Sequence, residues 1–466
     1  MIAIGLTVAR LVRGSADFFV AGRRLNAPLV FATVLASNIG AGATIGATGL
    51  GYRDGISAWW WSGSAAIGSI FLALFVGPRL WRIAAERNLY TAGDYLEARY
   101  GPTVRAIVAS LIWLATLSIL AGQLIAGAAV LTVVAGVPRW VGTMISALVM
   151  TATFVSGGLL GSTWVNAVQL VVLLCGFSAA LPIILGNAGG ISGILANSNV
   201  PSTFGDFLHS SGPGSGWTWL IALGPAFIIS PGLMQKAYGA SSARAVRRGI
   251  GFQAIALAAF AFIPPLLGMA ARALHPGITD PNLVLPTLLV EQLSPALGAL
   301  ALAAVFSAEV NTCDALLFML STSLSQDLYK RFLRPQATDA QLLRVARWSA
   351  FAGGVGGVLF ALRLATVIDA LKIFYALLGV TLLVPVIGGL YVRRAGSAEA
   401  LVSMAAGIAT LLVVRFAVVA HYPWVDPTAA GLVAAAIAFV LTLLVRGGRP
   451  SASHDARSSA SSSESS

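Results

Sequence analysis

The sequence has little charge. Only 10% of its 466 residues are Asp, Glu, Lys or Arg, 57% are hydrophobic, and the mean hydropathy is +0.85. A soluble domain of this length needs far more charge to cover its surface, so water cannot be the only solvent of this chain. The composition excludes an ordinary soluble protein and indicates a membrane protein.

Cysteine and histidine are also scarce. The two cysteines, Cys175 and Cys313, lie inside apolar runs, and they imply no disulfide framework. The sequence shows no His or Cys constellation with the spacing of a metal site and no nucleophile constellation of an enzyme. We therefore expect neither an enzyme nor a bound cofactor.

Apolar runs of about 20 residues are abundant, and a helix of that length crosses a roughly 30 Å hydrocarbon core. They predict an all-α polytopic membrane protein of twelve full spans, preceded by a short helix over residues 2–12 that is the remnant of a first helix. The membrane domain covers residues 1–446, and the serine-rich segment 447–466 is predicted to be a disordered tail. The predicted spans are 28–50, 57–78, 105–135, 140–157, 164–185, 217–235, 250–270, 296–326, 346–365, 370–391, 399–420 and 427–445.

The net charge of +12 would suggest nucleic acid as the partner of a soluble protein, but the positions of the basic residues indicate a lipid bilayer instead. Six basic clusters alternate with the predicted spans, so all six lie on one side, which the positive-inside rule makes the cytoplasm. The segment 186–216 has no Lys or Arg and is expected outside the cell, whereas the tail is expected in the cytoplasm. The clusters are Arg10, Arg13, Arg23 and Arg24; Arg79, Arg82, Arg87, Arg99 and Arg105; Lys236, Arg244, Arg247 and Arg248; Lys330, Arg331, Arg334, Arg344 and Arg347; Arg393 and Arg394; and Arg446, Arg449 and Arg457.

Helix-breaking residues interrupt two of the predicted spans. The first full span has five glycines between residues 40 and 51, and the span at 217–235 has Pro225 and Pro231. Backbone carbonyls freed by such residues are tolerated in lipid only where they line a polar cavity or bind something. The interruptions therefore predict a binding site.

The two interrupted spans each begin a block of five spans, residues 28–185 and 217–391. An odd number of spans gives the two blocks opposite orientations. Interrupted segments at matching places in two such blocks predict an inverted-repeat secondary transporter.

The richest polar cluster inside a span lies within residues 302–332. Ser307, Asn311 and Asp314 recur at three- and four-residue spacing and share one helix face, while Glu309 lies on another face. Ionisable and polar groups in a span are functional candidates because they are costly there. Oxygen donors of this kind suit a small alkali cation, although any one of them could instead hydrogen-bond to another helix.

Four segments resemble signatures of the sodium:solute symporter family. They are DFFVAGRRL (17–25), SNIGAGATIGATGLGY (37–52), TAGDYLEARYG (91–101) and NTCDALLFMLSTSLSQDLYKRF (311–332). The resemblance runs through almost the whole membrane region. It implies a ten-helix inverted repeat of the leucine-transporter type and sodium-coupled symport of a small organic solute.

The resemblance also implies a sodium site between the first and eighth helices of the repeat. Its ligands would be the backbone carbonyls of Ala36, Ile39 and Ala308 and the side chains of Asn311 and Thr312. The family usually has a hydroxyl residue in place of Asn311, and members with an additional cation site often have Asp in place of Asn166. Because Asp314 lies within one turn of the proposed ligands, Asp314 and Asn166 are a possible second cation or proton site.

The resemblance places the solute pocket at the two breaks and on the spans that face them. The candidate residues are Gly40, Gly42, Ala43, Thr44, Gln123, Phe227, Gln235 and Tyr375. Ala43 replaces the amide that sugar-transporting members would offer, so an amino acid or carboxylate is expected rather than a sugar. Two alternatives remain open: a proton-coupled symporter in which Asp314 or Glu309 titrates, and a non-transporting membrane sensor of the same family, which would be expected to carry a signalling domain.

Overall fold

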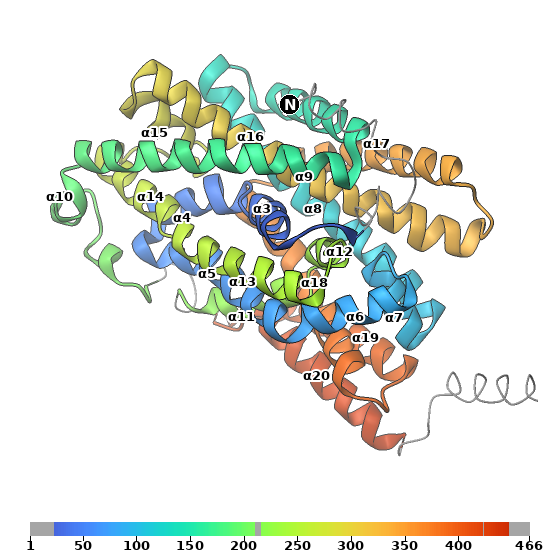
Figure 1. Cartoon of the computed structure of the whole chain (residues 1–466). Coiled ribbons are helices and arrows are strands. Elements are labelled where there is room, and N and C mark those ends of the chain that lie inside the picture. The colour runs from blue at the N-terminus through green and yellow to red at the C-terminus, as the bar shows by residue number, and fades with distance from the viewer. Residues whose placement is uncertain (1–22, 210–215, 423, 447–466) are drawn as a thin grey trace, which may run out of the picture.

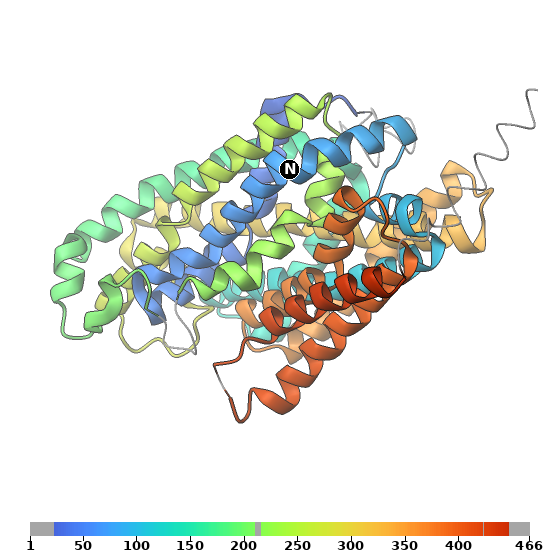
Figure 2. The ribbon, with the colours of Figure 1, turned by 90° about the horizontal axis from the view of Figure 1, so that it is seen from below.

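The computed structural model describes residues 23–209, 216–422 and 424–446, excepting the side chains of residues 153 and 155–167. Within these ranges the chain is helical, and its one extended contact is an isolated bridge between Leu25 and Ala240. Figure 1 and, after a 90° turn, Figure 2 show the long helices packed side by side, with the last two, α19 and α20, at one edge. The predicted short helix at residues 2–12 and the tail at 447–466 lie outside the described residues.

The first half of the chain begins with the interrupted span. Its elements are α3 (Ala27–Asn38), η2 (Gly42–Gly46), α4 (Ala47–Asp54), η3 (Gly55–Ala58), α5 (Trp59–Phe71), η4 (Leu72–Val76), α6 (Gly77–Arg87), α7 (Ala92–Tyr100), α8 (Pro102–Ala135), α9 (Arg139–Asn187), α10 (Gly190–Ala196) and η5 (Ser202–Gly205).

The second half begins with the other interrupted span. Its elements are α11 (Thr218–Ile228), α12 (Pro231–Tyr238), α13 (Ala243–Phe260), α14 (Ile263–Leu274), α15 (Val284–Gln292), α16 (Pro295–Thr322), η6 (Ser323–Leu333), α17 (Asp339–Arg363), α18 (Val367–Tyr391), α19 (Ser397–Val413), η7 (Val414–Val418) and α20 (Pro427–Val445).

Both predicted interruptions are confirmed. The first helix stops at Asn38 and resumes as the π-helical segment η2 at Gly42. The second stops at Ile228 and resumes at Pro231, which has no N–H and therefore suits the first position of a helix. Pro225, in contrast, lies inside α11.

The two interrupted helices lie antiparallel at their contact. Lys236 of α12 reaches Thr33 in the second half of α3, while Ala240 bridges to Leu25 just before α3 begins. The order of these two contacts makes the helices antiparallel, although the chain runs parallel at the bridge itself, which lies outside both helices. This arrangement is the one that an inverted repeat requires.

Ten helical stretches within the described residues are long and apolar enough to cross a membrane. Two features explain the difference from the predicted twelve. The first is that α3 alone is too short, while the rest of the first predicted span joins the second in one stretch, Gly42–Glu86. The second is that α9 contributes one of these ten stretches, Val168–Asn187, where two spans were predicted.

The helix α9 folds back on itself between Met150 and Gly176. Met150 contacts Cys313, and a Cβ on Gly176 would lie 3.0 Å from that of Ala304. A straight helix would separate the first two residues by about 39 Å, whereas Cys313 and Ala304 lie only about 14 Å apart along α16, at 1.5 Å per residue. Figure 1 shows the two arms of α9 running back to back, which matches the predicted spans 140–157 and 164–185.

Five of the six predicted basic clusters meet at one end of the bundle, at the right of Figure 1, called here the basic end. Arg23 donates to the Leu89 carbonyl next to the second cluster, and Arg99 of that cluster donates to the Arg393 carbonyl. Two further links are the hydrogen bond from Arg331 to Glu97 and the shared cavity of Arg79 and Arg244. The helix α10, from the segment without Lys or Arg, lies at the opposite end.

Large apolar side chains cover much of the outer surface. Leu148 is 73% exposed, Phe416 77% and Val445 85%, and many others resemble them. So many exposed large apolar side chains are not compatible with water, but they suit lipid. With its spanning stretches, the chain is a multi-pass membrane protein.

Candidate cation and solute site

The first interruption leaves backbone carbonyls without their helical partners. The last hydrogen bond of α3 runs from the Ile39 N–H to the Leu35 carbonyl, at 3.1 Å. The next donors do not continue the helix. The Gly40 N–H makes no backbone hydrogen bond among the described residues, the Ala41 N–H binds Gln123 Oε1 at 2.9 Å, and the Ala43 N–H binds the Gly40 carbonyl. Within the described chain, the carbonyls of Ala36 and Ile39 therefore receive no backbone N–H and can face a cation.

Helix α16 packs against this end of α3. Thr312 Oγ1 lies 3.4 Å from the Ser37 carbonyl oxygen, and a Cβ on Gly40 would come within 2.3 Å of that hydroxyl oxygen. Asn311, one residue earlier, is 1% exposed, and its Oδ1 has no hydrogen-bond partner among the described residues. The structure thus brings together the two halves of the predicted sodium site, with Ala308 also buried on α16.

A buried carboxylate supports the segment after the break. Glu309 of α16 is fully buried, and its Oε1 lies 3.0 Å from Thr44 Oγ1. The Ala41 N–H also reaches this carboxylate, but within the described part of the chain Oε2 of Glu309 has no hydrogen-bond partner. Glu309 is thus attached to the unwound segment through Thr44 and Ala41.

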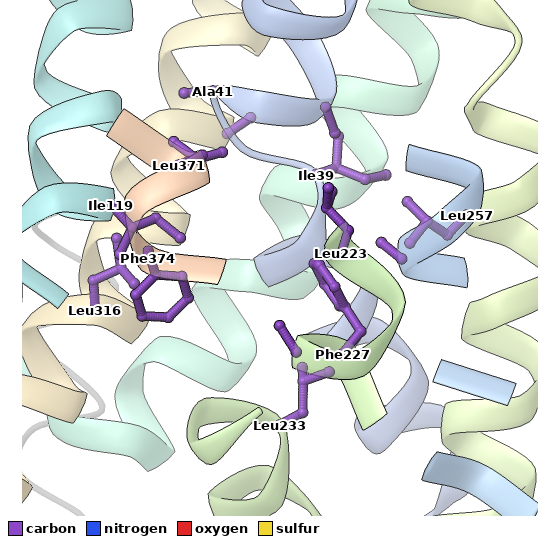
Figure 3. Packing of buried hydrophobic residues seen from close by; sticks show 14 of the residues in the cluster. Ile39, Ala41, Ile119, Leu223, Phe227, Leu233, Leu257, Leu316, Leu371 and Phe374 are labelled. Carbon is purple, nitrogen blue, oxygen red and sulfur yellow. The ribbon is translucent and has the colours of Figure 1, made fainter. Parts of the chain in front are cut away.

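A central cavity of about 80 Å³ lies beside the two breaks. Its walls are mainly apolar and aromatic, with ring centroids of Phe227 and Tyr375 5.1 Å apart and Trp61 6.2 Å from Tyr375. Figure 3 shows Phe227 and Leu223 of α11 on one side and Leu371 and Phe374 of α18 on another.

Six of the eight predicted solute-binding residues line this cavity: Gly40, Gly42, Ala43, Gln123, Phe227 and Tyr375. The other two point elsewhere. Thr44 turns toward Glu309, and Gln235 donates from Nε2 to Thr322 Oγ1 at 2.9 Å.

The cavity also contains a side chain that the sequence did not predict there. Lys236, assigned above to a cytoplasmic cluster, is only 4% exposed and lines the central cavity. That assignment is wrong for this residue, because its long side chain turns from α12 into the bundle toward α3. The one available signal was its position only five residues after Pro231 in an apolar span.

The predicted second cation or proton site is described only in part. Asp314 is buried on α16, with 8% of its surface exposed. Asn166 lies in the part of α9 whose side chains are outside the described set. Their pairing stays a prediction.

A second cavity, of about 370 Å³, lies beyond the central one on the side away from the basic end. Two apolar contacts separate the cavities: Leu371 packs against Gly42, and Ile368 packs against Gly46. A Cβ on either glycine would meet the end of that side chain at 2.3 or 2.8 Å. One turn of α18 therefore closes the central cavity on this side.

The sequence model of the sodium:solute symporter family matches residues 18–407. The chain belongs to this family. Within it, the sodium/pantothenate symporter of Escherichia coli (strain K12) is 28% identical over 410 residues, covering 84% of this chain and 82% of that protein. The sodium/glucose cotransporter of Vibrio parahaemolyticus is 24% identical over 464 residues, covering 89% and 83%.

The fold of this family member is that of a solved transporter. A substrate-bound, outward-open structure of a Na⁺-coupled sialic acid symporter matches it with a TM-score of 0.80 over 95% of each chain, at 20% identity. The predicted fold class is therefore confirmed, and the protein is a transporter and not an enzyme.

Proposed function

We propose that this chain is a sodium-coupled symporter of a small organic solute. The observation that carries the proposal is the freed end of α3 facing Thr312, with unpartnered carbonyls and a hydroxyl within a buried helix contact. Hard oxygen ligands of this kind suit sodium. The proposed ligands are the carbonyls of Ala36, Ile39 and Ala308 and the side chains of Asn311 and Thr312.

The proposed solute is an amino acid or small carboxylate. The central cavity is small and largely apolar, and the Lys236 ammonium lies in its wall. A sugar needs hydrogen-bonding partners around its whole ring, and Ala43 offers none where the polypeptide approaches the cavity.

Uptake into proteoliposomes tests both parts. A panel of labelled amino acids, carboxylates and sugars is offered with and without an inward sodium gradient. Concentrative uptake that needs sodium supports the proposal. Uptake driven by a pH gradient in the absence of sodium would instead establish the proton-coupled alternative, and failure of the whole panel in folded protein would favour the sensor.

Thr312 provides the sharpest test of the sodium site. Thr312→Val keeps the shape and removes the oxygen, so it should raise the sodium concentration for half-maximal uptake severalfold or more. Thr312→Ser is the matched control and should be mild. Unchanged sodium dependence in Thr312→Val would remove this residue from the site.

The basic end is proposed to face the cytoplasm, in accordance with the positive-inside rule. The tail at 447–466 follows the last basic cluster and would lie on the same side. Protease added to intact cells should then leave the tail uncut, and external cleavage would reverse the orientation.

A further inference from the structure

A cavity of about 330 Å³ at the basic end is lined by four arginines, and it is called here the arginine cavity. Two of the arginines come from α6 and two from the beginning of α13, while Tyr391 at the end of α18 forms another part of the wall. Apolar side chains of η4 and α6 complete the lining. The four arginines are Arg79, Arg82, Arg244 and Arg247, and the apolar residues are Leu74, Phe75 and Pro78.

The charges of these arginines are not neutralised by the protein. Within the described parts of the chain, none of the four forms an ion pair with a carboxylate. They differ in this respect from Arg105 and Arg331 at the same end, which both bind Glu97. Like charges around one cavity repel one another, and an anion inside it would offset that repulsion.

The beginning of α13 adds to the positive potential of the cavity. Arg244 and Arg247 lie in its first two turns, and the first turn contains no acidic residue. The N-terminal end of a helix carries a partial positive charge and therefore favours acidic side chains. A sequence that places arginines there instead breaks a local rule of stability, and such departures are expected at functional sites.

Arg79 is held in place by an aromatic ring. Its guanidinium carbon lies 4.2 Å from the ring centroid of Tyr391, and the Tyr391 hydroxyl donates to the Phe75 carbonyl at 3.0 Å. Contact with the ring uses the face of the planar guanidinium, whereas its N–H donors lie in the plane and stay available. Paired N–H donors of this kind bind the oxygens of a phosphate group.

The arginine cavity lies where the apolar outer surface meets the basic end. Phe71, Leu74 and Phe75 are exposed, and they precede Arg79 by one to two turns in the same helical stretch. A phospholipid at this position would have its acyl chains against these side chains and its phosphate among the arginines. Basic pockets between membrane helices suit anionic headgroups, whereas a free phosphate ion would make no use of the apolar part.

We propose that the arginine cavity binds the phosphate headgroup of an anionic phospholipid, with the acyl chains against Phe71, Leu74 and Phe75. The bound lipid connects α6, α13 and α18 at the basic end. This site is separate from the central cavity, and the proposal does not depend on the coupling ion or on the solute.

Lipid binding to the purified full-length protein in detergent tests the proposal. Native mass spectrometry compares the affinity for phosphatidylglycerol, which is anionic, with that for phosphatidylcholine, which has a phosphate but no net charge. The wild type should prefer phosphatidylglycerol at least about tenfold. Each arginine contributes roughly fivefold, so Arg82→Gln/Arg247→Gln should weaken phosphatidylglycerol binding about 25-fold and change phosphatidylcholine binding little.

The matched control removes two arginines of the basic end that do not line the cavity. Arg344→Gln/Arg347→Gln takes away the same amount of charge from exposed positions on α17. It should retain phosphatidylglycerol binding to within about twofold. An equal loss in both double variants would overturn the proposal, because the arginines would then act only through the overall charge of the protein.

Thermal unfolding in detergent gives a second measurement and shows whether each variant is folded. Phosphatidylglycerol should raise the melting temperature of the wild type but not that of Arg82→Gln/Arg247→Gln. Without lipid this variant should be at least as stable as the wild type, because fewer like charges surround the cavity. If it is not folded, Arg79→Gln/Arg244→Gln takes its place.

Inorganic phosphate distinguishes the two sources of a phosphate group. If millimolar phosphate without lipid raises the melting temperature of the wild type as much as phosphatidylglycerol does, the ligand is a free anion and the lipid proposal is overturned. Equal affinity of the wild type for phosphatidylglycerol and phosphatidylcholine would overturn it as well.

Discussion

The centre of the bundle and its basic end both bury polar and ionisable side chains, but only the charged ones at the basic end are fully paired. At the basic end, Arg105 binds Asp94, Glu97 and Asp327 at 2.6, 2.7 and 2.8 Å, and Arg331 binds Glu97 at 2.6 Å. At the centre, Glu309 Oε2 and Asn311 Oδ1 have no hydrogen-bond partner in the residues that the structure describes. The ion pairs of the basic end hold α7, α8 and η6 together, whereas the unpartnered oxygens at the centre remain available to bind an ion.

The largest effect is expected from breaking the saturated cluster at its centre. Arg105→Met leaves the Asp327 carboxylate, whose side chain is 3% exposed, without its cation. Loss of one partner of a buried pair costs about 3–5 kcal/mol. Thermal unfolding in detergent should therefore show a clear loss of stability. Arg331→Met is the control, because its side chain is 44% exposed and such pairs contribute at most about 1 kcal/mol. Equal melting temperatures of the two variants would contradict this ranking.

At the centre, a single added methyl group should strongly weaken sodium binding. Gly40→Ala would place a Cβ 2.3 Å from Thr312 Oγ1 and 2.8 Å from Gln123 Oε1, so both oxygens must move. We expect at least a tenfold loss of ²²Na⁺ binding with near-normal stability. The control is Gly251→Ala on α13, where nothing lies within 4 Å of the new methyl. Normal sodium binding by Gly40→Ala would show that the Thr312 hydroxyl does not contribute to the site in this position.

A smaller effect is expected from neutralising Glu309. Glu309→Gln keeps an acceptor for Thr44 but removes a carboxyl group, which can carry a negative charge when sodium binds, next to the proposed ligand Ala308. The sodium concentration for half-maximal uptake should rise about three- to tenfold. Glu309→Leu also removes the support of the unwound segment and should be worse. If both variants raise the sodium concentration for half-maximal uptake equally, Glu309 acts through its charge alone. If neither variant changes that concentration, Glu309 has no role in sodium binding.

The smallest effect is expected from acidification at the basic end. Burial raises the pKa of Glu97, but the hydrogen bonds and charges of Arg105 and Arg331 outweigh it and lower the pKa below its ordinary 4.5. A lowered folded-state pKa stabilises the protein above pH 4.5, and this contribution is lost as the pH falls through the folded value. The melting-temperature difference between wild type and Glu97→Gln should therefore be constant near neutral pH and shrink below about pH 4. A constant difference down to pH 3 would exclude Glu97 as its source.

The fold was largely predictable because its signals are local in the sequence. The glycines between residues 40 and 51 and Pro231 break helices through their own backbone chemistry, whatever surrounds them. Run length likewise predicted the two arms of α9. Run length could not predict that α3 ends at Asn38 as a separate short helix and that η2 begins a new one at Gly42.

The site was less predictable because helix rotation decides which side chain faces a cavity. Gln235 and Lys236 are neighbours, but successive helix residues point about 100° apart, and the structure turns Gln235 toward α16 and Lys236 toward α3. No local pattern determines that rotation. Packing between helices distant in the sequence does.

The two glycines that receive Leu371 and Ile368 differ from others in the molecule in what they allow. A Cβ on Gly268 would lie 2.2 Å from the Thr48 carbonyl oxygen, which belongs to the backbone and is present whatever residue stands at position 48. At Gly42 and Gly46 the nearest obstructing atom is the end of a side chain, Leu371 or Ile368, so an added methyl at either glycine can be largely offset by a shorter residue on α18. The side-chain volume that separates the two cavities can therefore come from either η2 or α18. Related sequences could redistribute bulk across this contact while keeping the barrier itself.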